Sequence, residues 1–212
     1  MSSIFIVNDT KITKRGKGRP KTFKREQALD AAMGVFFEHG YQGASMAELS
    51  KAMGMNPPSI YNAFTDKETL FIEVLEHYHM PYRTFMTETF EHGASVQDSV
   101  KTLFQASENQ HAKKQAMGCL IVNSSSAAPD EHTVIGAKLK ELHDINENTI
   151  YKGLKNGQEN GEILESVNIR KLARYINGVF QGAAVTARGQ HSAKAVKDLL
   201  DQGYNSFLKI IN

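Results

Sequence analysis

Residues 44–70 carry the sequence ASMAELSKAMGMNPPSIYNAFTDKETL, and the rest of the chain is interpreted outward from this segment. Ser45 and Glu48 form a capping box, in which the serine hydroxyl accepts from the Glu48 backbone N–H and the carboxylate reaches back. A short helix is predicted to follow, with one apolar face formed by Met46, Leu49, Ala52 and Met53. Gly54 is predicted to end this helix, because glycine readily adopts the left-handed conformation found after helices.

A second short helix is predicted directly afterwards. Asn56 can cap it, and Pro57 then occupies the first helical position, where a missing N–H costs nothing. The helix is predicted to end by Phe64, because Thr65-Asp66-Lys67-Glu68 has the pattern of a second capping box. Two short helices joined by Gly54-Met55-Asn56 are typical of a helix-turn-helix.

The composition of the second short helix favours a binding surface. Ile60 and Phe64 can face a core, which leaves Ser59, Tyr61 and Asn62 on the outside. An exposed tyrosine beside asparagine and serine suits contact with phosphates and base edges. The alternative is a helical hairpin in an ordinary all-α protein.

The flanking segments are predicted to be helical as well. An amphipathic helix is expected over residues 24–39, and Gly40 is expected to end it. A long helix is expected from Asp66 toward Pro81 and, with a kink there, on to Phe90. Further helices are expected over residues 95–110, 117–127, 130–158, 168–188 and 192–211, with breaks at Gly157, Gly161 and Gly189. The predicted fold class is all-α: an N-terminal three-helix helix-turn-helix domain followed by a C-terminal helical bundle.

The distribution of charge divides the chain further. The net charge is +2, but residues 1–25 hold eight bases and one acid, so a basic arm precedes a mildly acidic body. Basic arms of this kind commonly follow nucleic-acid phosphates. We therefore predict a basic N-terminal arm at residues 1–18, a DNA-binding domain at 19–65 and a ligand-binding and dimerisation domain at 66–212.

Length and composition limit the class of protein. The chain has 212 residues and is 41% hydrophobic, so it can bury a sizeable core. It has no run of about 18 apolar residues, so no membrane partner is expected. The single cysteine, Cys119, excludes an intrachain disulfide and favours a reducing compartment, which predicts the cytoplasm.

The motifs resemble those of the tetracycline-repressor (TetR) family of regulators. The similarity lies in Gly18-Arg19-Pro20, in residues 28–41 with Phe36-Phe37-Glu38-His39-Gly40-Tyr41, and in residues 44–55, 58–64 and 66–70. The resemblance covers about a third of the chain and implies a dimeric DNA-binding regulator with a divergent ligand domain. One departure is Pro57-Pro58, where many members carry a basic residue, so that phosphate contact cannot be carried over.

The resemblance also implies roles for individual side chains. Tyr61, Lys67 and Ser45 are expected to contact phosphates, the last at a helix N-terminus. Ser59 and Asn62 are expected at base edges, where asparagine suits adenine. Arg19 and Lys21 are expected in the adjacent minor groove.

The last two helices are predicted to form a homodimer that would match a palindromic operator in double-stranded DNA. Their apolar stripes are expected at this interface: Leu172, Ile176, Val179, Phe180, Ala183, Val196, Leu200, Tyr204 and Phe207. Gly178 and Gly182, four residues apart, would permit close helix approach. The alternative is that these stripes pack inside one monomer.

A pocket for a small-molecule inducer is predicted in the bundle, with apolar walls and few polar groups. Its expected lining is Tyr78, Tyr82, Phe85, Met86, Phe104, Cys119, Asn123 and Tyr151, with ordinary core packing as the alternative for each. Cys119 could instead sense oxidants if its thiol were activated. His132 and His143, eleven residues apart, could share a helix face and sense a metal, but no metal and no cofactor is expected.

Three classes of function are open from the residues alone: a ligand-responsive repressor, an enzyme and a non-specific nucleic-acid-binding protein that uses its basic arm. The sequence has no GxSxG, Walker loop, GxGxxG or HExxH motif, so an enzyme is not expected. The repressor is the function that these patterns favour most.

Overall fold

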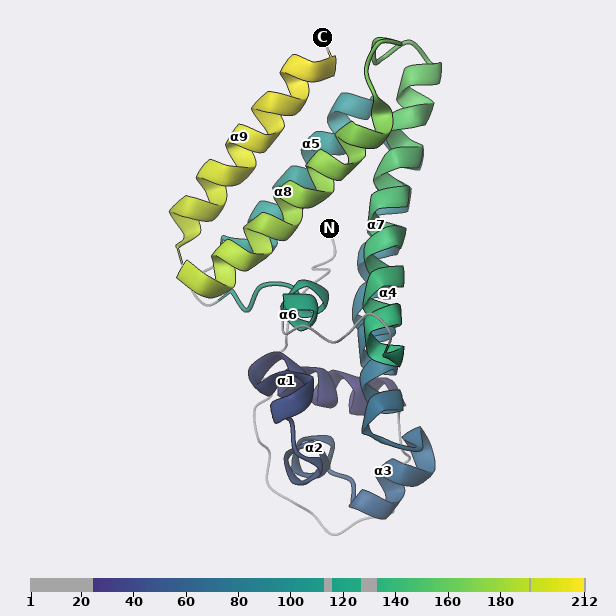
Figure 1. Cartoon of the computed structure of the whole chain (residues 1–212), viewed down its shortest axis with the longest axis vertical. Helices are drawn as coiled ribbons and strands as arrows, with labels where there is room; N and C mark the ends of the chain where they lie inside the picture. The colour runs from purple at the N-terminus through teal and green to yellow at the C-terminus, as the bar shows by residue number, and fades with distance from the viewer. Residues whose placement is uncertain (1–24, 113–115, 127–132, 191, 212) are drawn as a thin grey trace.

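The computed structural model describes residues 25–112, 116–126, 133–190 and 192–211. Within these ranges the chain is helical and contains no strands, which confirms the predicted fold class. Figure 1 shows an elongated molecule with the N-terminal helices at one end and a bundle of the later helices at the other. The helices are α1 (Arg25–Gly43), α2 (Met46–Met53), α3 (Pro57–Phe64), α4 (Lys67–His92), α5 (Val96–His111), α6 (Leu120–Ser126), α7 (Val134–Glu159), α8 (Ile169–Gln190) and α9 (Ala193–Ile211).

The first two helices begin and end for local reasons that the sequence predicts. Gly40 lies within the bounds of α1 but takes φ 68°, so the regular helix is interrupted there. Both halves of the capping box at α2 are present, with the Ser45 backbone N–H donating to Glu48 Oε2 at 2.9 Å. Gly54 ends α2 at φ 64°, in the left-handed region.

The junction between α3 and α4 differs from the prediction of a second capping box. Asn56 caps α3 as expected, and its Oδ1 accepts from the Ser59 N–H at 2.9 Å. The cap of α4, however, is Asp66, whose Oδ1 accepts from the Thr69 N–H at 2.7 Å. Thr65 instead closes α3 at φ 66°, so its conformation is that of a helix end. The predicted box was wrong by one residue, because a carboxylate at Asp66 competes successfully for the capping position.

Two hydrophobic cores follow one another along the molecule. The lower core joins α1, α2, α3 and the start of α4 to α6 and the first half of α7, with Leu49, Ile60 and Phe71 among its fully buried members. The upper core holds α5, α7, α8 and α9 together, with Ile176 and Phe207 at its centre. Helix α4 contributes to both, so it connects the helix-turn-helix to the bundle (Figure 1). None of the helices in the described ranges is long and apolar enough to cross a membrane.

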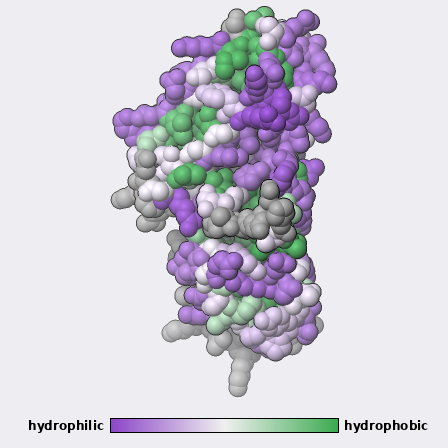
Figure 2. All heavy atoms as spheres, viewed as in Figure 1, coloured by the Kyte–Doolittle hydropathy of each residue, from purple (hydrophilic) through white to green (hydrophobic). Residues whose placement is uncertain are grey.

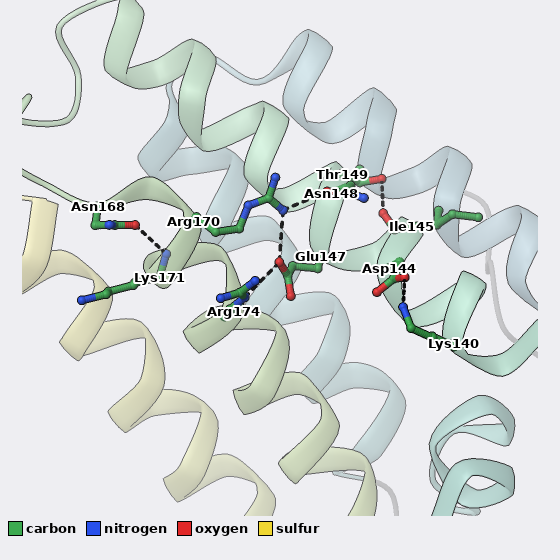
Figure 3. A network of polar contacts seen from close by, with 10 residues as sticks. All are labelled: Lys140, Asp144, Ile145, Glu147, Asn148, Thr149, Asn168, Arg170, Lys171 and Arg174. Atoms are coloured by element: carbon green, nitrogen blue, oxygen red, sulfur yellow. Dashed lines mark hydrogen bonds and ion pairs between the residues drawn. The ribbon is translucent and has the colours of Figure 1, made fainter. Parts of the chain in front are cut away.

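Polar contacts tie α7 to α8 on the surface of the bundle (Figure 3). Glu147 Oε1 on α7 accepts from Arg170 Nη1 at 3.1 Å and from Arg174 Nε at 3.3 Å. Arg170 also donates to Asn148 Oδ1 at 2.8 Å, and its guanidinium lies 3.7 Å from the centroid of the Tyr151 ring. These contacts fix the beginning of α8 against the middle of α7.

Two of the glycines predicted to break helices lie inside them. Gly157 is within α7 and Gly189 within α8, whereas Gly161 does follow a helix end at φ 77°. Gly157 is there because a β-carbon would lie 2.8 Å from Val96 Cβ, closer than such atoms approach. The glycine thus allows α5 and α7 to pack closely.

Candidate DNA-binding surface and ligand cavity

Helix α3 has one buried face and one exposed face. Ile60 and Phe64 are buried in the lower core, at 0% and 1% exposed. Ser59, Tyr61 and Asn62 are all exposed on the opposite side, and Tyr61 retains 48% of its accessible surface. The exposed face carries hydroxyls and an amide but no charged side chain, so its polar groups are available for base edges and phosphates.

Ser45 is exposed at the N-terminus of α2, as predicted, but its hydroxyl is already occupied. Oγ donates to Glu48 Oε2 at 2.7 Å, which lowers the pKa of the Glu48 carboxyl. His39 Nε2 lies 3.6 Å from the other oxygen of the same carboxylate. A phosphate at this end of α2 would therefore meet backbone N–H groups and a serine held by the capping box.

Lys67 lies at the start of α4, beside the end of α1. Its Nζ is 4.8 Å from the centroid of the Tyr41 ring and 3.5 Å from the Gln42 carbonyl oxygen. Partial burial lowers the pKa of Lys67. The lysine is thus held near the helix-turn-helix and is not a fully solvated surface residue.

Arg25 is a structural residue of this region that the sequence patterns did not single out. Its guanidinium forms a bidentate ion pair with Glu73 on α4 and donates from Nη1 to the Ala63 carbonyl at 3.1 Å. It also lies 4.4 Å from the centroid of the Phe64 ring. Because Glu73 is 48 residues away, no local signal could identify this pair. The two predicted minor-groove residues, Arg19 and Lys21, lie outside the described residues.

A cavity lies in the bundle just above the lower core. Its empty space is about 530 Å³ with the open mouth included. Helices α4, α5, α6, α7 and α8 all contribute to its wall. The lining residues are Tyr78, His79, Tyr82, Gln110, Cys119, Ile121, Val122, His143, Asn146, Asn177, Phe180 and Gln181.

Three of the eight predicted pocket residues, Tyr78, Tyr82 and Cys119, line this cavity. The other five have different surroundings. Met86 is fully buried in the upper core, and Phe85 packs against that core. The Phe104 ring lies tilted against the rings of Phe180 and Tyr204, at 4.8 and 5.6 Å between centroids. Tyr151 lies under Arg170, and the Asn123 amide donates to the Met117 carbonyl at 2.8 Å. Nothing in their spacing separated cavity wall from ordinary core.

Two histidines that the sequence patterns did not assign to the pocket lie in its wall. His79, 4% exposed, has its Nε2 2.7 Å from Asn146 Oδ1. His143 Nε2 lies 2.8 Å from Ser125 Oγ, and its Nδ1 lies 3.2 Å from Gln181 Nε2. Since Ser125 donates its own proton to the Ile121 carbonyl, it accepts from His143, and a neutral ring protonated on Nε2 satisfies both contacts.

Burial keeps the titratable groups of the cavity uncharged at neutral pH. It lowers the pKa of His79 and of His143, and it raises the pKa of Tyr78 and of Tyr82. Burial also raises the pKa of the Cys119 thiol. A thiol that stays protonated is a weak nucleophile, which argues against the oxidant-sensing role considered for Cys119.

The described residues include no group of three or more histidine, cysteine, aspartate or glutamate side chains able to hold a metal ion. His132, one half of the pair considered for metal sensing, lies outside the described residues. His77 serves a structural contact, since its Nε2 lies 2.8 Å from Asp30 Oδ1 and links α4 to α1.

The stripes predicted for the dimer interface lie in the upper core of one protomer. Eight of the nine residues are 9% exposed or less, and Tyr204 is half-buried and stacks on Phe207. Packing inside one protomer accounts for the burial of these residues: Leu172, Ile176, Val179, Phe180, Ala183, Val196, Leu200 and Phe207. The amphipathic period was correctly predicted, and the buried face packs inside the protomer, so a dimer contact through these residues stays a prediction.

The outward faces of the same two helices carry different stripes. On α8, small and apolar residues are exposed or half-exposed at alternating steps of three and four: Tyr175, Gly178, Gly182, Val185 and Gly189. On α9, the corresponding positions hold Ala195, Leu199, Gln202, Ser206 and Ile210. The two stripes adjoin, since a β-carbon on Gly182 would lie 3.4 Å from Leu199 Cδ2. Figure 2 shows hydrophobic residues on this upper half of the molecule, over α8 and α9.

Comparison with known proteins agrees with the geometry. Two family descriptions match the chain: bacterial regulatory proteins of the tetR family over residues 28–74, and the tetracyclin repressor-like C-terminal domain over residues 97–202. The HTH-type transcriptional repressor ComR of Escherichia coli (strain K12) is 33% identical over 86% of this chain and 88% of its own length. The uncharacterized HTH-type regulator YezE of Bacillus subtilis (strain 168) is 28% identical over 76% of this chain and 84% of its own.

A solved structure has the same architecture. It is a cysteine mutant of the TetR family regulator CifR complexed with 26-bp double-strand operator DNA, with a TM-score of 0.80, 26% identity, and coverage of 89% of this chain and 99% of CifR. An exposed recognition helix in a helix-turn-helix, joined to an all-α body with a cavity, defines a DNA-binding transcriptional regulator. The chain belongs to the TetR family of bacterial regulatory proteins.

Proposed function

We propose that this protein is a cytoplasmic homodimeric repressor that binds a palindromic operator and is released from it by a small molecule. The observation that carries the proposal is the exposed face of α3. Ser59, Tyr61 and Asn62 form this uncharged polar face, and the opposite face of the helix is buried in the lower core. Asn62 is assigned to an adenine edge, and Tyr61 and Lys67 to phosphates. Relatives named as repressors, such as ComR, support the direction of regulation.

The proposed dimer forms through the outward stripes of α8 and α9. One α3 reads only a few base pairs, and a two-fold axis doubles the contacts on a palindrome. Gly178 and Gly182 allow a partner helix to approach closely, and Val185, 52% exposed, supplies apolar surface beside them. The proposed interface therefore uses the residues between the buried ones on the same two helices.

The proposed release passes through α6. Ile121 on this helix lines the cavity and is also buried, at 2% exposed, in the lower core that supports the helix-turn-helix. Ser125, one turn later, holds His143 of the cavity wall. A ligand that fits the cavity best when α6 and α4 are displaced would favour protomers whose recognition helices no longer match successive major grooves.

Selection of bound fragments from a random duplex pool, at near-physiological salt, tests this proposal. Enrichment of a palindrome is the expected result. Weak, salt-labile binding without a motif would contradict it and would indicate non-specific binding through the basic arm. Deleting residues 1–18 distinguishes a sequence-specific regulator from a protein that binds DNA non-specifically through its basic arm. The regulator should keep its sequence preference, whereas the non-specific protein should lose nearly all affinity for DNA.

A further inference from the structure

The described wall of the cavity is largely apolar with several polar side chains, and it contains no residue type with a permanent charge. Its twelve residues include no lysine, arginine, aspartate or glutamate. A charged ligand buried here would lose its hydration without gaining an ion pair, which is strongly unfavourable. The composition of the wall therefore discriminates against organic anions and cations alike.

The histidines of the wall do not change this conclusion at neutral pH. Each is engaged as a neutral ring, His79 with Asn146 and His143 with Ser125 and Gln181. The charged groups that act electrostatically on them include Arg83 and Glu141 for His79, and Asp144 for His143, and none of these three lines the cavity. No cationic imidazole is therefore offered to an anion.

Most polar groups of the wall already have partners within the protein. Gln110 Nε2 donates to the Tyr78 hydroxyl at 3.4 Å, and the two histidine rings hold two further amides. The amide of Asn177 on α8 is different, since it lines the cavity and makes no hydrogen bond to any other described residue. It offers one N–H donor pair and one carbonyl acceptor to a ligand.

The rings of the wall define the rest of the ligand. Tyr78 and Tyr82 on α4 and Phe180 on α8 line the cavity beside Asn177. Aromatic side chains pack favourably against flat aromatic groups in offset or edge-to-face arrangements. A ligand with a planar aromatic ring and one polar substituent would match these aromatic side chains and the amide of Asn177.

We propose that the ligand is an uncharged aromatic molecule whose single hydrogen-bonding group, of the carboxamide or carbonyl type, binds to Asn177. This inference rests on the proposed function, because it specifies the ligand of the same cavity. It assigns Asn177 as the residue that fixes the orientation of the ligand.

A series of three probes with one shape tests the inference on the full-length protein without DNA. Cinnamamide is uncharged, cinnamate is an anion and cinnamylammonium is a cation. We expect cinnamamide to bind at least about tenfold more tightly than either charged probe in calorimetric titrations at pH 7. Asn177→Leu should weaken cinnamamide binding by about 2–10-fold, the usual net contribution of one hydrogen bond. The control Asn156→Leu removes an exposed amide of α7 and should leave the affinity unchanged.

Tighter binding of either charged probe overturns the inference, as does the failure of all three to bind. Equal binding to the Asn177→Leu and wild-type proteins also overturns it. Because these titrations contain no DNA, a negative result in them would not affect the operator selection as evidence for the proposed function. Conversely, a failed operator selection with intact cinnamamide binding would refute the repressor and not the ligand class.

Discussion

The substitution Asn62→Ala separates recognition of the operator from stability of the fold. Asn62 is exposed on α3, and its side chain makes no hydrogen bond with another described residue. Alanine also has the higher helix propensity, so the free energy of unfolding should change by no more than about 0.5 kcal/mol. Any large effect on DNA binding must then come from a lost contact.

The expected loss of affinity follows from symmetry. One asparagine contact with an adenine edge is worth about 1–3 kcal/mol. A C₂ dimer makes this contact once in each half-site, so the variant should lose about 2–6 kcal/mol, or about 30-fold to about 10⁴-fold in the dissociation constant. The loss should concern one base pair in each half-site.

Fluorescence anisotropy with the enriched palindrome, at constant salt, measures the affinity. A panel of duplexes with each position changed in turn then reveals the specificity. Asn62→Ala should bind all substitutions at one position of the half-site equally well, while wild type should discriminate among them. The exposed Asn156→Ala variant on α7 is the matched control and should behave as wild type.

Two results would refute the reasoning. Wild-type affinity in Asn62→Ala would show that α3 does not read a base through this residue. A uniform loss over all sequences, with an unchanged pattern of discrimination, would assign Asn62 to a phosphate contact and leave base reading to other residues.

Three further predictions concern the body of the protein. Gly157→Ala forces a methyl group against α5, so chemical denaturation should show a free energy of unfolding lower by about 1–3 kcal/mol, less a gain of up to about 1 kcal/mol in helix propensity. The control Gly34→Ala has open space around it and should stabilise the protein in the same assay. Stabilisation by both variants would contradict the packing argument. Val185→Glu places a charge in the proposed interface and should yield monomers in sedimentation analysis, at concentrations where wild type and the exposed control Val134→Glu are dimeric. A dimeric Val185→Glu variant would place the interface elsewhere. Burial lowers the pKa of His79 below its ordinary value of 6.5, so as pH falls the unfolded chain takes up a proton before the folded protein does. The free energy of unfolding should therefore decrease below about pH 6.5, and His79→Gln should reduce this pH dependence. An identical pH profile of stability in the variant would exclude His79 as the cause.

Local signals account for what the sequence predicted well. The capping box at Ser45, the left-handed Gly54 and the cap at Asn56 each depend on residues within four positions of one another, so their outcome is set before tertiary packing. The same signals predicted which side of α3 is exposed, whereas DNA binding by the residues on that side stays a prediction.

Contacts between distant segments explain what was missed. The cavity wall at His143 depends on Ser125 and Gln181, which lie 18 and 38 residues away in the sequence. No sequence pattern predicts that these three residues come into contact. The apolar stripes of α8 and α9 gave the correct period, yet Ile176 could equally have faced its own protomer or a partner. Periodicity identifies a buried face, but only the packing of all the helices shows what covers it.

The ratio of affinities for the enriched palindrome and for a scrambled duplex, measured at near-physiological salt, tests the central claim most directly. A sequence-specific regulator that reads bases through α3 should prefer its palindrome by at least about a thousandfold, and an isolated half-site should bind far more weakly than the whole palindrome. A ratio near one would contradict the account, because the protein would then hold DNA by its backbone charge alone.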